Sequence, residues 1–288
     1  MSAPRKLDLR IDAHLHLWDL AVSDYAWLHP EQGSLYATYT AADAKAELDA
    51  SGIDWAVLVQ AEDSLADTEF LLETADANAW VAGVVGWVQL DDPAATEYAL
   101  DQWQQHRAFC AVRNLLHMDT RGDFLTLSGV QKSLGLLVRR GIPYDVPDAW
   151  PRHLSAAAVL AADFPDLTIV IDHLGKPPIG RPDYDDWREA ITRVAAHPNT
   201  VAKFSGLRMP GTPFTTLALR PTWETALELF GPSRLMYGGD WPMTVPAGGY
   251  GPTWRVMAEL IGELSAAEQS LLMGGTAVAT YGLGRAAC

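Results

Sequence analysis

The sequence is poor in cysteine and in basic residues. Two cysteines, Cys110 and Cys288, lie in an apolar run and at the last position, which excludes a disulfide framework and fits a reducing compartment. Lysine and arginine number 21 against 36 aspartates and glutamates, so the formal net charge is -15 at pH 7. Nucleic acids and anionic membrane surfaces bind basic proteins, and we therefore expect neither as a partner.

The sequence also lacks long apolar runs. No stretch approaches the roughly 20 apolar residues that span a membrane, and the first residues lead into the first expected strand without the apolar segment of a signal peptide. We therefore expect a cytoplasmic protein that acts on a small molecule, and we assign no oligomeric state.

Short apolar runs alternate with helical patterns along the whole chain. Near-continuous apolar strands are typical of parallel sheets covered by helices on both faces. The expected strands cover residues 11–19, 55–60, 81–89, 109–113, 142–145, 167–172, 201–205 and 234–238. The pattern predicts an α/β protein in which residues 1–288 form a single (β/α)8 TIM barrel. A doubly wound open sheet is the alternative, but its Gly-rich phosphate turn is missing after the first strand.

Two histidines stand in the first expected strand. Residues two apart in a strand share a face, so we expect Asp12, His14 and His16 to point the same way. In a barrel the active site lies at the C-terminal ends of the strands, where His173 and Asp240 also stand. Three imidazoles and one carboxylate suit one divalent ion of the zinc type with a water in the open position. The same four residues also suit a metal-free hydrogen-bonded cluster, and both interpretations stay open.

Other side chains near strand ends are candidates for substrate binding. Arg113 shares a strand face with Ala111, and an inward arginine needs an anion or a carbonyl as partner, either on the substrate or in an internal ion pair. We expect Lys203 to be ion-paired with buried acids. The aromatic segment 17–39 is expected to form a lid or a pocket wall. The remaining candidates for substrate contact are Lys176, Tyr144, Trp18, Trp27 and Trp241.

Several motifs carry a family resemblance that spans essentially the whole chain. They include the first-strand run with His14 and His16, the run His173-Leu174-Gly175-Lys176-Pro177, and the run Gly239-Asp240-Trp241-Pro242. In this order they resemble the amidohydrolase superfamily, and within it the branch of sugar lactonases and 2-pyrone-4,6-dicarboxylate lactonase. The resemblance implies a distorted (β/α)8 barrel that hydrolyses a cyclic ester.

The resemblance also implies roles for the site residues. Asp240 would activate water, and His173, with His14 and His16, would polarise the carbonyl or bind metal. Binuclear members carry a lysine or glutamate after strand four and a histidine after strand five, whereas this chain has Arg113 and Tyr144-Asp145 there, so a two-metal centre is not expected. Some members of the lactonase branch work without metal. A metal-dependent decarboxylase, or a hydrolase of amides or dicarboxylate lactones, is the alternative function.

The balance of side chains around the expected site bears on the substrate. A dicarboxylate lactone would need several arginines, because each buried carboxylate loses hydration unless it is paired. Here few cations and many aromatic rings stand near the strand ends. We therefore expect an aldonolactone of the fucono-, galactono- or rhamnono- type.

Overall fold

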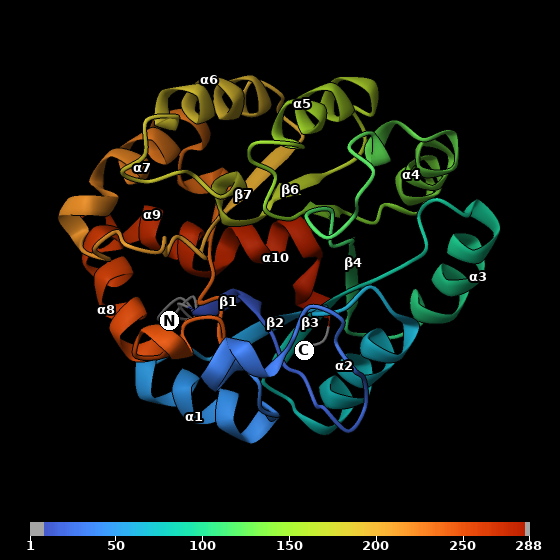
Figure 1. The fold of residues 1–288 in the computed structure, drawn as a ribbon, viewed down its shortest axis with the longest axis horizontal. Helices are drawn as coiled ribbons and strands as arrows, with labels where there is room; N and C mark the ends of the chain where they lie inside the picture. Colours follow the sequence, from blue (N-terminus) through green and yellow to red (C-terminus); the bar gives the residue numbers. More distant parts are fainter. Residues whose placement is uncertain (1–8, 286–288) are drawn as a thin grey trace, which may run out of the picture.

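The computed structural model describes residues 9–285, so Cys288 lies outside the described residues. Eight parallel strands follow one another around a single sheet in chain order (Figure 1). They are β1 (Ile11–Leu15), β2 (Trp55–Val59), β3 (Val81–Gly86), β4 (Phe109–Arg113), β5 (Tyr144–Val146), β6 (Ile169–Ile171), β7 (Thr200–Phe204) and β8 (Leu235–Tyr237). This arrangement confirms the predicted barrel.

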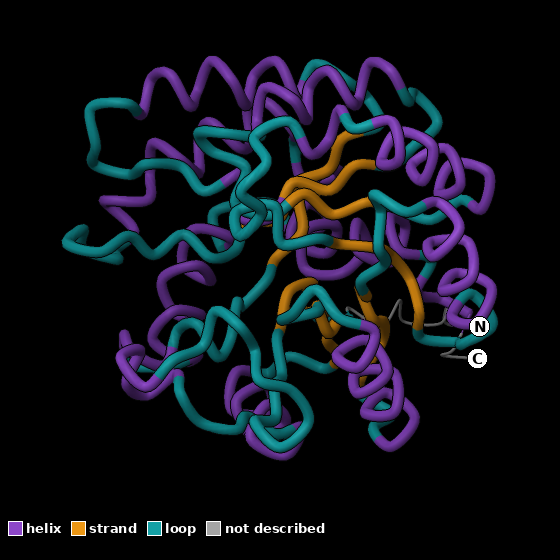
Figure 2. The backbone as a smooth tube through the Cα atoms, turned by 45° about the vertical axis from the view of Figure 1, so that its right-hand side comes forward, coloured by secondary structure: helices purple, strands orange, loops and turns teal. Residues whose placement is uncertain are grey.

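Helices surround the strands and follow each of them in turn (Figures 1 and 2). Eight of them, α1 to α8, form the outer layer of the barrel. The helices are α1 (Ala41–Ser51), α2 (Leu65–Ala77), α3 (Pro93–Trp103), α4 (Ser128–Arg140), α5 (Leu154–Asp163), α6 (Tyr184–Ala195), α7 (Thr216–Phe230), α8 (Tyr250–Ile261), α9 (Ala266–Ser270) and α10 (Thr276–Tyr281). Within residues 9–285, no helix combines the length and the apolar character that crossing a bilayer requires.

Apolar side chains fill two concentric layers. Inside the barrel, alternate strand positions such as Ala13, Val57, Val85, Ala111 and Met236 pack together. The opposite strand faces pack against the helices and form the larger core cluster. Both faces of each strand are buried, and this explains why each strand is a nearly continuous apolar run in the sequence.

The barrel closes near the candidate site. The chain after β8 pairs with β1 through a bridge between Leu15 and Trp241. His16 N donates to Trp241 O at 2.7 Å, and Asp240 N donates to His14 O at 2.8 Å. The two segments that carry the histidine pair and Asp240 are therefore joined by backbone hydrogen bonds.

The closing helical segment after α8 is interrupted by an irregular turn. α9 ends at Ser270, a wider turn covers Leu271–Gly275, and α10 follows. Gly274 passes so close to the start of β1 that a Cβ there would lie 2.4 Å from the carbonyl oxygen of Leu9. The close approach requires glycine at position 274.

Candidate active site

A cavity opens among the loops that follow the strands. It brings together most of the residues that the sequence singled out, from β1, β4, β6 and the segment after β8. The lining residues are His16, Trp18, Trp27, Ala61, Arg113, Leu115, His117, Asp148, His173, Lys176, Asp240 and Met243.

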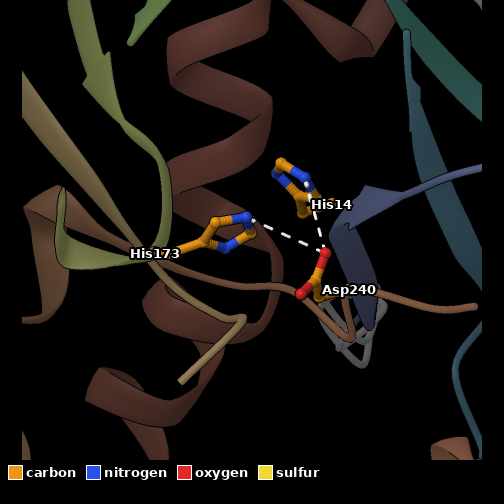
Figure 3. Close-up of side chains that lie close together, drawn as sticks. All are labelled: His14, His173 and Asp240. Atoms are coloured by element: carbon orange, nitrogen blue, oxygen red, sulfur yellow. Dashed lines mark ion pairs between the residues drawn. The ribbon is translucent and has the colours of Figure 1, made fainter. Parts of the chain in front are cut away.

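Three imidazoles converge on one carboxylate oxygen at the floor of this cavity. Asp240 Oδ1 lies 3.9 Å from His14 Nε2, 3.7 Å from His16 Nε2 and 3.8 Å from His173 Nε2. Figure 3 shows His14 and His173, whose ring centroids lie 4.4 Å apart, both directed toward Asp240. The four predicted site residues therefore form one cluster, although they are up to 226 positions apart in the chain (240 minus 14).

Each imidazole is oriented through its other nitrogen. His16 Nδ1 donates to the carbonyl oxygen of Val59 at 2.8 Å, and His173 Nδ1 pairs with Ser205 Oγ at 2.8 Å. His14 Nδ1 lies 3.3 Å from Asp172 Oδ1 and 3.2 Å from Lys203 Nζ. Such contacts fix ring orientation and leave the Nε2 atoms directed at Asp240.

A fully buried ion network lies beneath the histidines. Lys203 Nζ lies 2.7 Å from Asp145 Oδ2 and 2.9 Å from Asp172 Oδ1, as expected for a lysine paired with buried acids. Arg113 Nε lies 2.9 Å from Asp172 Oδ2. Arg113 from the end of β4 and Lys203 from β7 thus surround Asp172 with the chain's own cations. The carboxylate of Asp145 in β5 is paired with Lys203.

Burial sets the ionisation of the cluster. Burial raises the pKa of Asp240 to about 7 and lowers the pKa of His14 to about 4. Burial also holds the pKa values of His16 and His173 well below their usual range. For Lys203, burial opposes the charged form, but the carboxylates of Asp145 and Asp172 outweigh it and raise the pKa. The imidazoles are therefore neutral at pH 7.

Unusual backbone conformations concentrate at the cavity. Six non-glycine residues in the described part of the chain have positive φ, and four of them line the cavity: Asp148, His173, Lys176 and Asp240. Such conformations cost of order 1–3 kcal/mol each and are kept where surrounding structure imposes them. The strand-end loops hold these side chains toward the cavity at that cost.

Gly206 makes room for His173. Its φ is 57°, and a Cβ at this position would lie 2.3 Å from His173 Nδ1. The imidazole therefore lies directly over the backbone of Gly206. The preceding residue, Ser205, supplies the hydroxyl that pairs with the same ring. This explains the Ser-Gly step that follows β7.

Asp12 does not share the face of His14 and His16, contrary to the expectation. It accepts hydrogen bonds from Gly239 N at 2.9 Å and from the hydroxyl of Tyr250 at 2.8 Å. Between Asp12 and Leu15, β1 advances three residues while β2 advances two. The extra residue reverses the side-chain alternation, so Asp12 braces the segment after β8 instead of joining the imidazoles.

The aromatic segment after β1 forms a wall of the cavity. Trp18 and Trp27 line the cavity and meet edge to face, with ring centroids 5.3 Å apart. Their indole nitrogens donate to the carbonyl oxygens of Ala37 and Ala61, each at 2.7 Å. Of the two expected roles for residues 17–39, the structure shows the wall.

Tyr144 and Trp241 lie behind the cavity wall, which corrects the expectation that both face the substrate. Tyr144 is fully buried and belongs to the layer between strands and helices. Trp241 is 2% exposed and packs edge-on against Tyr39, with ring centroids 5.2 Å apart. Strand register explains the placement of Tyr144, since successive residues of β5 face opposite sides, and packing against Tyr39 explains that of Trp241.

Asp148 and His117 also line the cavity, and the sequence did not identify Asp148. The fifth strand was expected to end at Asp145, but β5 continues to Val146. The strand end therefore lies one residue later, and Asp148 follows it. A strand boundary extended over Val146 would have found this carboxylate.

The cluster has the donor set for one metal ion. Ligand atoms of His14, His173 and Asp240 all lie within 4.8 Å of one another. His16 Nε2 lies 3.0 Å from His14 Nε2 and adds a further donor. Three neutral imidazoles and a carboxylate, with ring nitrogens oriented by neighbours, are a ligand set that zinc accepts.

Known proteins resemble this chain over most of its length. The L-fucono-1,5-lactonase of Burkholderia ambifaria is 33% identical over 249 residues, covering 85% of this chain and 84% of that protein. The L-fucono-1,5-lactonase of Burkholderia multivorans is 32% identical, covering 96% of each chain. A crystal structure of an amidohydrolase from Burkholderia multivorans with bound zinc superposes with a TM-score of 0.85 at 31% identity, covering 95% of this chain and 99% of that one.

The family assignment follows from a match over nearly the whole chain. A sequence profile of the amidohydrolase family matches residues 11–283. The matched range begins with β1 and ends after α10, so it contains every strand of the barrel and the whole His-Asp cluster. The chain therefore belongs to the amidohydrolase family of enzymes, as the motifs of its sequence predict.

Proposed function

We propose that this enzyme hydrolyses a sugar-derived lactone, an aldonolactone of the L-fucono-, L-galactono- or L-rhamnono- type, to the open acid. The observation that carries the proposal is the convergence of the Nε2 atoms of His14, His16 and His173 on Asp240 Oδ1, at 3.7 to 3.9 Å. Two relatives at 33% and 32% identity are L-fucono-1,5-lactonases, and this supports the choice of substrate class.

In the proposed reaction Asp240 takes a proton from a water molecule, and the oxygen of that water attacks the lactone carbonyl. The imidazole of His173, assisted by His14 and His16, stabilises the oxyanion. Collapse of the tetrahedral intermediate breaks the bond to the ring oxygen, and the proton held by Asp240 goes to that leaving oxygen. A positioned base contributes about 10²–10⁴ in rate, and one oxyanion contact about 10²–10³.

One divalent ion of the zinc type, held by His14, His16, His173 and Asp240, would supply Lewis acidity to the carbonyl when bound. Without an ion, His173 serves as a hydrogen-bond donor to the oxyanion through Nε2, and His14 and His16 contact each other beside it. Both versions assign the same proton transfer to Asp240.

Arg113, Lys176, Trp18 and Trp27 line the cavity and are proposed to hold the ring. The indole faces suit the C–H face of a sugar ring. An N–H of Arg113 can donate to a neutral ring oxygen, although its charge is balanced by Asp172.

The proposal is tested by steady-state kinetics with L-fucono-1,5-lactone and with 2-pyrone-4,6-dicarboxylate at equal concentrations. We expect the aldonolactone to have the higher kcat/KM. A preference of about tenfold or more for the dicarboxylate would overturn the substrate class. Release of carbon dioxide from an aromatic acid, with no acid formed from either lactone, would point to a decarboxylase instead.

A further inference from the structure

Asp148 carries a buried carboxylate oxygen that the proposed reaction does not use. The residue follows β5 and lines the cavity. Within the described part of the chain, Asp148 Oδ1 is buried and accepts no hydrogen bond. It lies 3.8 Å from Lys176 Nζ and 4.0 Å from His173 Nε2. An unsatisfied buried acceptor costs about 1–3 kcal/mol, so this oxygen is arranged for a donor that arrives with the ligand.

The backbone directs this oxygen toward the cavity. Asp148 has φ of 34° and Lys176 has φ of 64°, conformations that few non-glycine residues adopt. The two loops are joined by Trp150 N, which donates to Gly175 O at 2.8 Å. Asp148 and Lys176 are therefore held as a pair beside the His-Asp cluster, on the side of His173.

The charges of the cavity leave no place for a substrate carboxylate. Its cations are Arg113 and Lys176. Arg113 pairs with Asp172 at 2.9 Å and donates to Gln60 O at 3.0 Å. Lys176 faces Asp148, and both Asp148 and Asp240 line the same cavity. A carboxylate on the substrate would meet two protein carboxylates and no uncommitted cation among these lining residues.

We propose that Asp148 is a specificity-determining residue that accepts a hydrogen bond from a ring hydroxyl of the lactone and rejects rings that carry a carboxylate. Lys176 holds the Asp148 side chain at the cavity and offers its remaining N–H bonds to the same hydroxylated edge. The inference rests on the proposed function, because it assumes that the substrate is a lactone.

The test compares three probes that share a six-membered lactone ring. L-Fucono-1,5-lactone carries hydroxyls, δ-valerolactone carries none, and 2-pyrone-4,6-dicarboxylate carries two carboxylates. Two variants separate the functions of the side chain. Asp148→Gly accommodates the positive φ and removes both oxygens. Asp148→Asn tolerates the same backbone, keeps one acceptor oxygen and removes the charge.

For Asp148→Gly we expect kcat/KM on L-fucono-1,5-lactone to fall about 10- to 100-fold, the range for a hydrogen bond to a charged group. The rate on δ-valerolactone should stay within about twofold, since that ring offers no hydroxyl to lose. For Asp148→Asn we expect a smaller loss on the hydroxylated lactone and a rise in kcat/KM on the dicarboxylate. Unchanged δ-valerolactone hydrolysis also reports that each variant is folded.

Asp183→Asn is the matched control. Asp183 Oδ2 accepts from the indole nitrogen of Trp150 at 3.1 Å, next to the same loop, but Asp183 does not line the cavity. This variant should keep the wild-type ranking of the three probes. Equal losses on L-fucono-1,5-lactone and δ-valerolactone in both Asp148 variants would show a structural role and overturn the inference. If the wild-type enzyme opens neither lactone, the proposed function fails, and the inference fails with it.

Discussion

His14 Nε2 lies 3.0 Å from His16 Nε2. A carbonyl oxygen only accepts, so the contact of His16 Nδ1 with Val59 O places the hydrogen of the neutral His16 ring on Nδ1. His16 Nε2 is therefore a bare acceptor. The 3.0 Å contact then needs either a hydrogen on His14 Nε2 or a cation between the two nitrogens. With the hydrogen on His14 Nε2, the bare Nδ1 accepts from Lys203 Nζ. With a cation at Nε2, the hydrogen is on Nδ1 and is donated to Asp172 Oδ1.

We expect the purified protein to bind one zinc-class ion per chain, because four candidate ligands converge at Asp240, whereas β4 ends in Arg113 and the Asp145 carboxylate of β5 is paired with Lys203. Elemental analysis by mass spectrometry measures the content. His16→Asn should lose most of the metal, whereas His197→Asn, distant from the cavity, should keep it. Two stoichiometric ions would contradict the site, and none would select the metal-free arrangement.

Asp240→Asn should leave the fold intact and reduce turnover by roughly three orders of magnitude, because the amide cannot take the proton of the attacking water. Turnover on L-fucono-1,5-lactone and the thermal unfolding midpoint are measured side by side. Turnover close to that of the wild-type enzyme would exclude Asp240 as the base.

Gly206→Ala should reduce turnover by about 10²-fold, since its Cβ would collide with the His173 ring and displacements of about 1 Å have such costs. Gly211→Ala is the matched control, because Gly211 also has positive φ, 77°, with nothing within 4 Å of the added Cβ. Backbone strain is common to both variants, and the clash is specific to Gly206. Equal activities in the two variants would show that His173 does not need its observed position.

Lys203→Met should lower the free energy of unfolding by about 3–5 kcal/mol, because it leaves the fully buried Asp145 and Asp172 without their common cation. Lys45→Met removes an exposed ion pair with Asp49 and should change the free energy of unfolding by less than about 1 kcal/mol. Urea unfolding measures both variants. A small effect at Lys203 would mean that Arg113 alone compensates Asp172.

Asp67 predicts a pH dependence of stability. Burial raises the pKa of Asp67 to about 7, although Ala61 N and Glu62 N donate to its carboxylate. Its folded pKa exceeds the unfolded value, so the native state binds the extra proton. This contribution to stability is complete below the unfolded pKa and is lost as pH rises through about 7.

The measurement is urea unfolding of wild type and Asp67→Asn between about pH 4 and pH 8. The amide keeps an acceptor for the two N–H groups and does not titrate. The stability of the wild type relative to the variant should therefore fall with rising pH, by at most about 1.4 kcal/mol per pH unit. A difference that does not vary with pH would show that Asp67 is ionised throughout.

Most strands were predictable because parallel strands are buried on both faces. The range of β4 was predicted without error, and β2 within one residue, from apolar runs alone. Short strands were harder: β5, β6 and β8 contain three residues each, and flanking apolar residues lengthen the apparent run. The boundary of β5 mattered for the site, because the misplaced strand end concealed Asp148.

By itself, the sequence determined the barrel and the four residues of the His-Asp cluster. Side chains at the C-terminal ends of the strands of a barrel meet at one rim, and this does not depend on the conformation of the loops. Only the tertiary structure decided which neighbours reach the cavity. An extra residue in β1 turned Asp12 away, the packing against Tyr39 placed Trp241 behind the wall, and a left-handed backbone brought Asp148 inward. These outcomes depend on register and on single φ angles, which periodicity of apolar residues does not encode.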